Sequence, residues 1–362
     1  MSNDDMRPNR NSRNKSSSKK STTTKKTGQT SNKAKKRKKK KKKLNLVKFF
    51  TFIAMLLVLL ITIGLTIFFK FFNKLDRVDL DKSNLGITDS SELSKYSNFK
   101  DIKNIALFGI DAPNGENGRS DATMILTIDP VHNKIKLTSL MRDSYVAIKG
   151  NGEDKLNHAY AYGGPELAIR TINENFGLNI EDFATVNFSS LPKIINILGG
   201  VDIEIRQDEI EHINFVLVDV NNITGEKSPM LTSAGMQNLD GNQALAYSRV
   251  RATAGGDFER TERQRVVLSA LFNKVKEKPI SSFPSLISKI LPFVQTNLTS
   301  SDILAIGTKM IGVGNGTLEQ QRFPKDDYCY GDYVDEVWYL MFDKNATTQQ
   351  IRDYLFDDII SD

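Results

Sequence analysis

Hydrophobic and polar positions follow different patterns in different parts of the chain. Residues 49–69 are 21 consecutive uncharged residues rich in Leu, Ile and Phe. Residues 103–110 and 122–128 are short apolar runs, and residues 134–141 alternate apolar and polar positions. Short runs of these kinds predict β-strands, whereas the first segment predicts a helix long enough to span a bilayer core of about 30 Å.

Pro, Gly and Asp mark where the other elements begin and end. Pro165 can begin a helix that runs to Asn175 and ends before Gly177, because Pro suits a first helical position and Gly the residue after the last. Asp240 and Asp257 can each cap a helix. Further strands are predicted at 183–188, 201–205 and near 318–323, and helices at 192–198, 240–248, 257–278, 283–294, 301–311 and 347–359. This mixture predicts an α/β fold, with α+β as the alternative, in which helices cover a central mixed sheet.

Charge is distributed unevenly. The whole chain carries +7, but residues 1–43 hold 18 Lys or Arg and two acids, a net of +16, so the remainder carries −9. The basic segment contains almost no apolar residues and is predicted to be disordered. Because its Lys run precedes the apolar segment, the N-terminus is predicted to be cytoplasmic. The predicted organisation is a cytoplasmic tail (1–43), a transmembrane helix (44–70), a juxtamembrane stalk (71–98) and an extracellular domain (99–362).

Two other observations bear on this topology. A cleaved signal peptide is the alternative, but the apolar segment is longer than usual and no small-residue cleavage site follows it. Cys329 is the only cysteine and the three histidines are far apart. An intrachain disulfide is therefore impossible, and a His-rich zinc site of ordinary spacing is excluded.

The ends of the predicted strands bring acidic residues together. If residues 103–110 and 122–128 pair as a hairpin, Asp111 and Asp121 lie at one edge of the sheet, with Arg119 in the connecting loop. An antiparallel third strand returns Arg142 and Asp143 to the same edge. Two carboxylates without a nearby His or Cys suit a hard cation such as Mg²⁺ or Mn²⁺. Turn residues and surface ion pairs are the alternative interpretation.

A second cluster of charge lies between residues 249 and 265. On a helix that begins at Asp257, Arg260 and Gln264 share a face with the apolar residues Val267 and Leu271. An Arg on an inward face requires an anion, either an acidic side chain or a bound phosphate. The alternative is that Glu259 and Glu262 balance a solvated face, although neither lies on the face of Arg260.

At these two clusters the chain resembles the LytR–CpsA–Psr family of cell-wall glycopolymer transferases. The motifs occur in the family's order across residues 105–270. They are FGID (108–111), RSDAT (119–123), RDSYV (142–146), LGGV (198–201), LDGNQALAYSRVR (239–251) and DFERTERQ (257–264). The departures, such as Met141 where Pro is common, leave the charged positions intact. The loop between Asp111 and Asp121 is shorter than in some members.

The resemblance implies an enzyme that transfers a glycopolymer phosphate, such as a wall teichoic acid or capsular polysaccharide, from a polyprenyl-pyrophosphate carrier to a peptidoglycan hydroxyl. It implies Mg²⁺ held by Asp111 and Asp121, and places Arg119, Arg142, Asp257 and Arg260 at the reaction centre. Asp257 would orient Arg260 or accept the proton of the hydroxyl, and several nearby arginines favour the first role. The residues expected to bind the pyrophosphate are Arg119, Arg142, Arg249, Arg251, Arg260, Arg263 and Gln264.

The family also has an apolar pocket for the polyprenyl chain between sheet and helices. The candidate lining residues are Phe183, Val186, Phe188, Ile194, Ile195 and Leu198. Any one of them taken alone is more often an ordinary core residue.

Three other functions remain as alternatives. A phosphohydrolase on the same lipids would use the same residues with water as acceptor. A membrane-tethered regulator with a nucleic-acid-binding tail is disfavoured, because the tail has no aromatic residue to stack on bases. Anionic membrane lipid is the better partner for the tail. A glycan-binding adhesion module would not need inward-facing arginines and paired carboxylates.

Overall fold

The computed structural model describes residues 54–59, 62, 76–112, 118–253, 255–313 and 318–360. The chain divides into two compact units, residues 1–60 and 61–362. In the first unit, residues 54–59 are helical. Among the described residues, no helix combines the length and the apolar character needed to cross a bilayer. The predicted basic tail and most of the predicted membrane segment lie outside the described residues, so both stay predictions.

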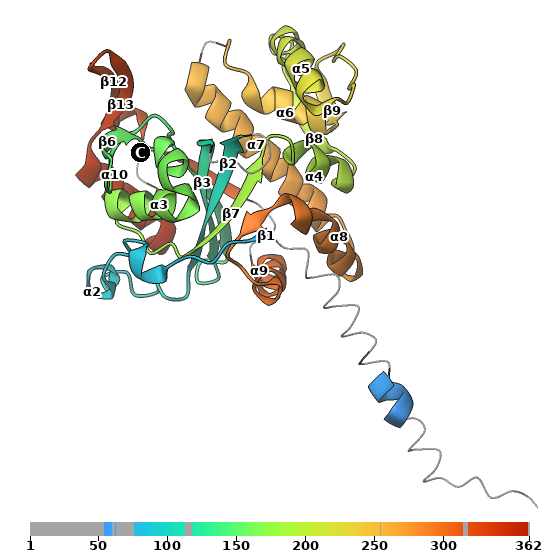
Figure 1. Ribbon diagram of the computed structural model, residues 1–362, viewed down its shortest axis with the longest axis horizontal. Coiled ribbons are helices and arrows are strands. Elements are labelled where there is room, and N and C mark those ends of the chain that lie inside the picture. Colours follow the sequence, from blue (N-terminus) through green and yellow to red (C-terminus); the bar gives the residue numbers. More distant parts are fainter. Residues whose placement is uncertain are drawn as a thin grey trace, which may run out of the picture. The chain divides into compact units, whose positions relative to one another are not determined.

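A seven-stranded mixed sheet forms the centre of the second unit (Figure 1). Strands β2, β3 and β4 pair antiparallel, as the sequence predicted, while β7 pairs parallel to β2 and β11 parallel to β4. The short strands β10 and β1 extend the sheet beyond β7. In spatial order the strands are β1 (Asp76–Arg77), β10 (Gln295–Thr296), β7 (Asp182–Asn187), β2 (Lys103–Asp111), β3 (Arg119–Asp129), β4 (Lys134–Leu140) and β11 (Leu318–Phe323). The predicted mixed α/β architecture is confirmed.

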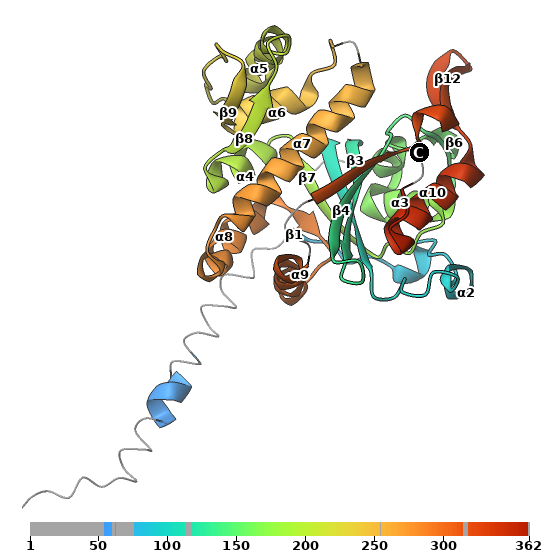
Figure 2. The same ribbon diagram turned by 180° about the vertical axis from the view of Figure 1, so that it is seen from behind.

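Helices cover both faces of the sheet (Figures 1 and 2). One face packs against α3 (His158–Phe176) and α10 (Lys344–Asp357), and the other against α4 (Leu191–Leu198), α7 (Gly256–Lys276) and α8 (Phe283–Ile290). Helix α9 (Ser300–Gly312) precedes β11.

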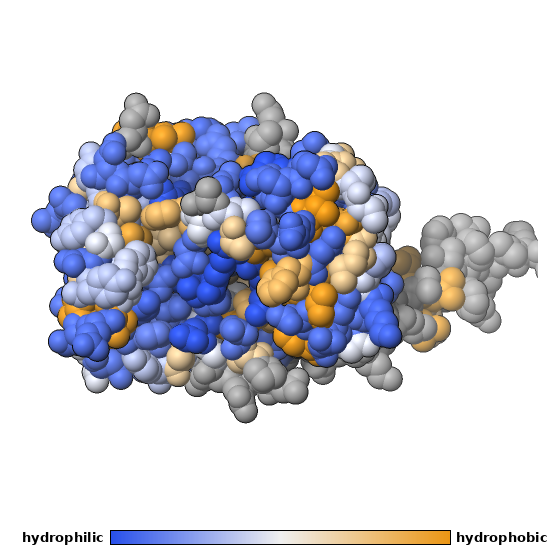
Figure 3. Space-filling view, turned by 90° about the horizontal axis from the view of Figure 1, so that it is seen from above, coloured by the Kyte–Doolittle hydropathy of each residue, from blue (hydrophilic) through white to orange (hydrophobic). Residues whose placement is uncertain are grey.

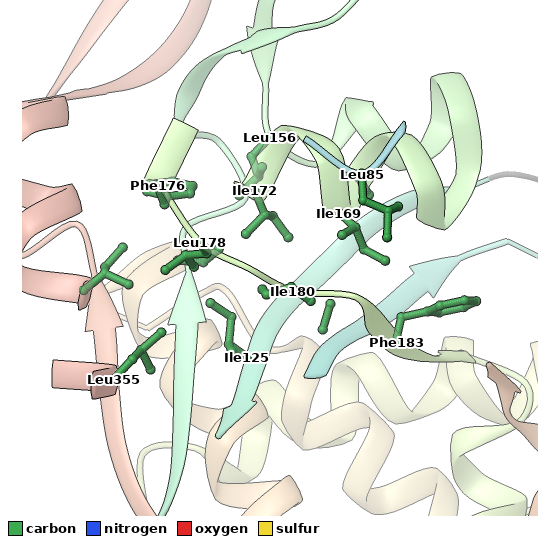
Figure 4. Packing of buried hydrophobic residues seen from close by; sticks show 14 of the residues in the cluster. Leu85, Ile125, Leu156, Ile169, Ile172, Phe176, Leu178, Ile180, Phe183 and Leu355 are labelled. Atoms are coloured by element: carbon green, nitrogen blue, oxygen red, sulfur yellow. The ribbon is translucent and has the colours of Figure 1, made fainter. Parts of the chain in front are cut away.

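The main core lies between the sheet and α3. Figure 4 shows Ile125 of β3 and Phe183 of β7 facing Ile169 and Ile172 of α3, and all four side chains are fully buried. Leu355 of α10 belongs to the same cluster. Because side chains alternate across a strand, the residues next to Ile125 and Phe183 in sequence point to the opposite face of the sheet, where α4, α7 and α8 lie.

A second core supports a smaller group of elements beside α7. It contains Val201, Leu217 and Leu245, which are almost fully buried. The predicted cap of α6 is confirmed, because the Asp240 carboxylate accepts a hydrogen bond of 2.9 Å from the Gln243 amide. The elements of this group are β8 (Val201–Ile205), α5 (Ile210–Thr224), β9 (Gly235–Leu239) and α6 (Gly241–Arg249).

The prediction of a free stalk before residue 99 is wrong for residues 76–98. Leu85 and Leu93, the latter at the end of the short helix α2 (Ser90–Leu93), are fully buried in the main core. Asn173 of α3 donates a hydrogen bond of 2.8 Å to the Leu85 carbonyl. The segment is polar on average, but most of its apolar side chains join the main core, and the Tyr96 ring lies 5.4 Å from that of Phe356 in α10. Residues 71–75 lie outside the described residues.

Three local features differ from the sequence predictions. Helix α7 begins after Gly255, and no side chain caps it, so Asp257 is not the predicted cap. Helix α5 was not predicted. Two hairpins were also missed, namely β5 (Tyr145–Ile148) with β6 (Gly152–Lys155), and β12 (Cys329–Val334) with β13 (Val337–Phe342).

Candidate functional site

A β-bulge places Asp121 at the edge of the sheet. Gly109 pairs with Ala122, and the next residue, Ile110, pairs with Ser120. Asp121 is therefore the extra residue on β3. A bulge bends a strand and redirects the side chain of the extra residue. Asp111 pairs with Arg119 at the end of the same ladder, which confirms that the predicted residues meet at one edge.

Arg142 follows β4 and is bound to three carboxylates at this edge. Its Nη1 lies 2.7 Å from Asp121, its Nη2 lies 3.1 Å from Asp257 and its Nε lies 3.1 Å from Asp143. The planar guanidinium has donors in all three directions. Arg142 is thereby held in one orientation at the centre of the cluster.

Arg251 and Arg260 approach the same carboxylates more loosely. Arg251 lies 3.5 Å from Asp121 and 3.6 Å from Asp257. Arg260 lies 3.9 Å from Asp121 and 3.6 Å from Asp257, beyond hydrogen-bonding distance. The Arg260 side chain is 3% exposed, and its Nε has no hydrogen-bond partner among the described residues. A buried guanidinium with an unused donor has capacity to bind an anion.

The shift in pKa singles out Arg260 as a poorly compensated cation of the cluster. Burial and the charge of Arg142 lower the pKa of Arg260 to about 10. Burial opposes ionisation of Asp257, but the charges of Arg260, Arg142 and Arg251 outweigh it and lower its pKa below the usual 3.8. Asp257 is thus ionised at neutral pH. An anionic ligand would relieve the repulsion between the arginines.

Arg142, Arg251 and Arg260 line a polar cavity of about 380 Å³. Five arginines and three aspartates face it, so arginine charge exceeds carboxylate charge at its wall. The charged lining residues are Asp111, Arg119, Asp121, Arg142, Asp219, Arg249, Arg251 and Arg260. Figure 3 looks onto this edge of the unit and shows hydrophilic residues gathered in a central hollow.

An apolar cavity of about 280 Å³ adjoins the polar one. It lies on the face of the sheet opposite α3, between the sheet and helices α4, α7 and α8, and Phe188, Ser248 and Gln264 line both cavities. The guanidinium of Arg249 lies 5.0 Å from the centre of the Phe188 ring, at this junction. The two cavities therefore form one site with an apolar part and a cationic part.

Half of the predicted lipid-pocket residues line the apolar cavity. Val186, Phe188 and Ile194 do so, whereas Phe183 belongs to the core beneath α3 and Ile195 to the second core. The predictions for Phe183 and Ile195 are wrong. Phe183 is an odd number of residues from Val186 and therefore faces the other side of the sheet. Ile195 follows Ile194 on helix α4 and points in a different direction, into the second core. Leu198 lines a neighbouring apolar hollow that shares Ile194.

Arg263 was predicted to bind pyrophosphate, and that prediction is wrong. Its Nε lies 3.0 Å from Glu209 and one Nη lies 2.9 Å from Glu259. It also donates to the Val250 carbonyl and the Thr253 hydroxyl. Arg263 does not line the cavity. Its bonds to Val250 and Thr253 fix the segment that follows Arg249.

Several residues that line the two cavities were not predicted from the sequence. Asp219 and Val216 of α5 line the polar cavity, but α5 itself was not predicted. Leu107 of β2 and Met124 of β3 line the apolar cavity. Their strands were predicted, so the alternation of side chains was a signal that could have identified them.

Asp111 and Asp121 could hold a cation only if a bound ligand supplied further oxygen atoms. Within the described residues, no group of three or more His, Cys, Asp or Glu could hold a metal ion. Asp111 and Asp121 line one cavity, but both carboxylate oxygens of Asp121 already face arginines. Mg²⁺ commonly takes one or two carboxylates and completes its shell with phosphate oxygens and water. A bound phosphate would supply the missing ligands.

Comparison with known proteins finds relatives that are named as a transferase and as a regulatory protein. "Polyisoprenyl-teichoic acid--peptidoglycan teichoic acid transferase TagU" of Enterococcus faecalis is 34% identical over 208 residues, which are 56% of this chain and 63% of TagU. The chain thus spans less than two thirds of that relative. "Regulatory protein MsrR" of Staphylococcus aureus (strain COL) is 31% identical over 258 residues, covering 70% of this chain and 74% of MsrR.

Solved structures share the fold. "TagT bound to LI-WTA" superposes with a TM-score of 0.57 at 27% identity, covering 71% of this chain and 90% of that one. "LytR-CPS2A-psr family protein YwtF (TagT) with bound octaprenyl pyrophosphate lipid" has a TM-score of 0.54 at 26% identity, covering 72% and 91%. The profile of the LytR_cpsA_psr family matches residues 67–354, and the chain belongs to this family.

Proposed function

We propose that this chain transfers an anionic glycopolymer of the teichoic acid type, together with one phosphate, from a polyprenyl-pyrophosphate carrier to a hydroxyl of peptidoglycan. The observation that carries the proposal is the continuity of an apolar cavity with a cavity lined by five arginines. A prenyl chain fits the first and a pyrophosphate the second. TagU is named as a transferase of this kind, and the TagT structures contain ligands of this class.

The arginines bind the non-bridging oxygens of the pyrophosphate. Arg251 and Arg260, which approach Asp121 and Asp257 at 3.5–3.9 Å, exchange these loose contacts for phosphate oxygens. Arg142 keeps its shorter bonds and holds the carboxylates in place. Negative charge grows on the leaving phosphate as the bond breaks, so fixed positive charge stabilises the transition state more than the bound substrate.

The acceptor hydroxyl oxygen bonds to the phosphorus that carries the polymer. The bond from that phosphorus to the bridging oxygen breaks, its electron pair leaves with polyprenyl phosphate, and the hydroxyl proton passes to this leaving phosphate. Asp257 is a weak base because its pKa is held below 3.8. Its role is to orient Arg142, Arg251 and Arg260, which it contacts.

We propose Asp111 and Asp121 as ligands of Mg²⁺ or Mn²⁺ that is bound jointly with the pyrophosphate. When bound, the cation would neutralise phosphate charge. EDTA is then expected to slow turnover, and excess Mg²⁺ to restore it, measured as release of polyprenyl phosphate. Ca²⁺ should restore less activity, because it prefers more ligands at longer distances. Turnover that is indifferent to chelation would remove the metal role of both aspartates.

Filling the apolar cavity should discriminate against long prenyl chains. Ala184 lines this cavity, so Ala184→Phe is expected to raise KM for a donor with a long prenyl chain at least about tenfold, equivalent to about 1.4 kcal/mol. A donor with a very short chain should be affected much less. Steady-state kinetics with both donors measure this ratio. Equal effects on the two would argue that the prenyl chain binds elsewhere.

The polyprenyl carrier is a membrane lipid, so the proposed location is the outer face of the cell membrane, with residues 44–70 as a single anchor and the N-terminus in the cytoplasm.

The decisive experiment supplies the full chain with a synthetic lipid-pyrophosphate glycan and peptidoglycan oligomers. Polymer joined to peptidoglycan supports transfer. Free polymer phosphate as the sole product would instead indicate a pyrophosphohydrolase.

A further inference from the structure

The C-terminal hairpin exposes aromatic rings on a well-supported surface. Tyr333 of β12 lies directly opposite Trp338 of β13, so both rings are on one face of the hairpin. Tyr333 is 68% exposed and Trp338 is 37% exposed. The Trp338 indole packs against Gly331, where a Cβ atom would come within 2.6 Å of its Nε1. The absence of a side chain at Gly331 thus leaves room for the indole.

A second set of aromatic and polar groups supports the base of the hairpin on its other face, where Tyr339 is buried. The Asp154 carboxylate accepts hydrogen bonds from the Tyr162 hydroxyl (2.6 Å) and from the Tyr339 hydroxyl (3.3 Å). His158 Nδ1 lies 2.7 Å from the same carboxylate. The Tyr145 and Tyr339 rings meet edge to face at 4.7 Å. These contacts hold the phenolic and imidazole groups in fixed positions beside the hairpin.

The surface is connected directly to Arg142. Lys155 Nζ lies 3.0 Å from Asp143 and close to the ring centres of Trp338 (5.8 Å) and Tyr339 (5.6 Å). The other oxygen of Asp143 contacts Arg142 Nε at 3.1 Å. In addition, the Leu340 amide of β13 donates to the Asp143 carbonyl at 2.9 Å. A ligand on the hairpin would therefore lie next to the cationic cavity.

The chemistry of this surface suits a sugar chain. A pyranose ring has a flat face of C–H groups, which packs on an aromatic ring, and a rim of hydroxyls, which form hydrogen bonds with exposed polar groups such as the Tyr333 hydroxyl. The charge selects among sugars. Residues 329–342 contain Asp332, Asp335 and Glu336 but no Lys or Arg, so the hairpin repels a phosphate-rich polymer and accepts an uncharged glycan.

We propose that the aromatic hairpin surface, defined by Tyr333 and Trp338, binds the glycan backbone of the acceptor and presents its hydroxyl to the arginine cavity. The inference rests on the proposed function, because it assigns the acceptor side of that reaction. The donor occupies the two cavities, and the acceptor approaches from the hairpin side past Asp143. Exposed rigid aromatics are the residues that most often anchor a binding surface.

The test uses the single tryptophan of the chain. Trp338 lies in the surface itself, so its fluorescence reports binding there without a label. The full chain in detergent is titrated with a soluble β-1,4-linked N-acetylglucosamine tetramer, and in parallel with inorganic polyphosphate. The emission of Trp338 is expected to change saturably with the tetramer and not with polyphosphate.

Variants of Tyr333 distinguish the contribution of its aromatic ring to binding from effects on folding. Tyr333→Ala is expected to raise Kd for the tetramer about tenfold, as for loss of one aromatic anchor, and Tyr333→Phe to keep it within about twofold. The matched control is Phe215→Ala, since Phe215 is an aromatic residue of α5 that is 77% exposed and lies outside the hairpin; its Kd should be unchanged. No saturable change in emission, or equal Kd values for Tyr333→Ala and Phe215→Ala, would overturn the proposal.

The binding measurement requires no turnover, so its result is independent of the proposed reaction. Saturable tetramer binding without any transfer in the reconstituted assay would overturn the proposed function and leave the glycan surface in place. Transfer without tetramer binding would support the proposed function and overturn the proposed glycan surface.

Discussion

Replacing Arg260 with alanine is expected to lower kcat for transfer about 10²–10³-fold, the range found when one preorganised donor to a developing negative charge is removed. Arg260 is buried at the junction of the charged cluster, its Nε has no hydrogen-bond partner among the described residues, and burial together with the charge of Arg142 lowers its pKa to about 10. Such a guanidinium is poorly stabilised by the protein alone. Its interactions are completed by the substrate.

The same reasoning predicts the effect on stability. Arg260→Ala removes a buried charge that the protein compensates only at 3.6–3.9 Å, so the melting temperature should stay the same or rise, a common trade-off between stability and activity at functional sites. Arg77→Ala is the matched control, since Arg77 is half exposed and pairs with the nearby Asp79. Unchanged kcat in Arg260→Ala would exclude its role in the reaction.

Replacing Arg263 with alanine is expected to have the opposite profile, destabilising the fold by about 3–5 kcal/mol. The residue itself is buried, and its partner Glu209 is 1% exposed. Without Arg263 the Glu209 carboxylate would remain buried with only Arg206, at 3.5 Å, as a nearby cation among the described residues. Urea denaturation measures the loss as a lower midpoint with an unchanged slope.

A double variant distinguishes lost charge pairing from lost packing. Arg263→Met combined with Glu209→Leu should recover much of the stability, because a buried ion pair can often be replaced by apolar residues of similar size. Full stability of Arg263→Ala together with a specific loss of pyrophosphate binding would instead restore the role that the sequence suggested for Arg263.

Strand geometry correctly predicted which charged residues meet at the edge of the sheet. Three antiparallel strands necessarily return Asp111, Asp121 and Arg142 to one edge, and the register confirms this. Likewise, steps of three and four along α7 placed Arg260 and Gln264 on one face, and both line the polar cavity. Arg263, three residues after Arg260, passes the same check of helical position, and only its pairing with the distant Glu209 removes it from the cavity.

Other errors came from contacts between distant segments. Residues 76–98 are polar on average, but Leu85 and Leu93 are buried in the main core with residues of α3, which begins only at His158. The hairpin at residues 329–342 has a short apolar strand and an acidic turn, in which Asp335 and Glu336 adopt positive φ. Its proximity to Arg142 arises from a parallel bridge between Ser144 and Leu340, which no local pattern encodes.

The sequence by itself determined the mixed fold, the strands that meet at the charged edge and the inward face of α7, because side-chain periodicity and the direction of consecutive strands are local properties. Only the tertiary structure decided which arginines face the cavity and which are neutralised by protein carboxylates. It also decided which apolar residues line a pocket and which fill a core. These distinctions depend on what lies opposite each side chain, and the partners, such as Glu209 for Arg263 and Asp257 for Arg142, come from elements far apart in the chain.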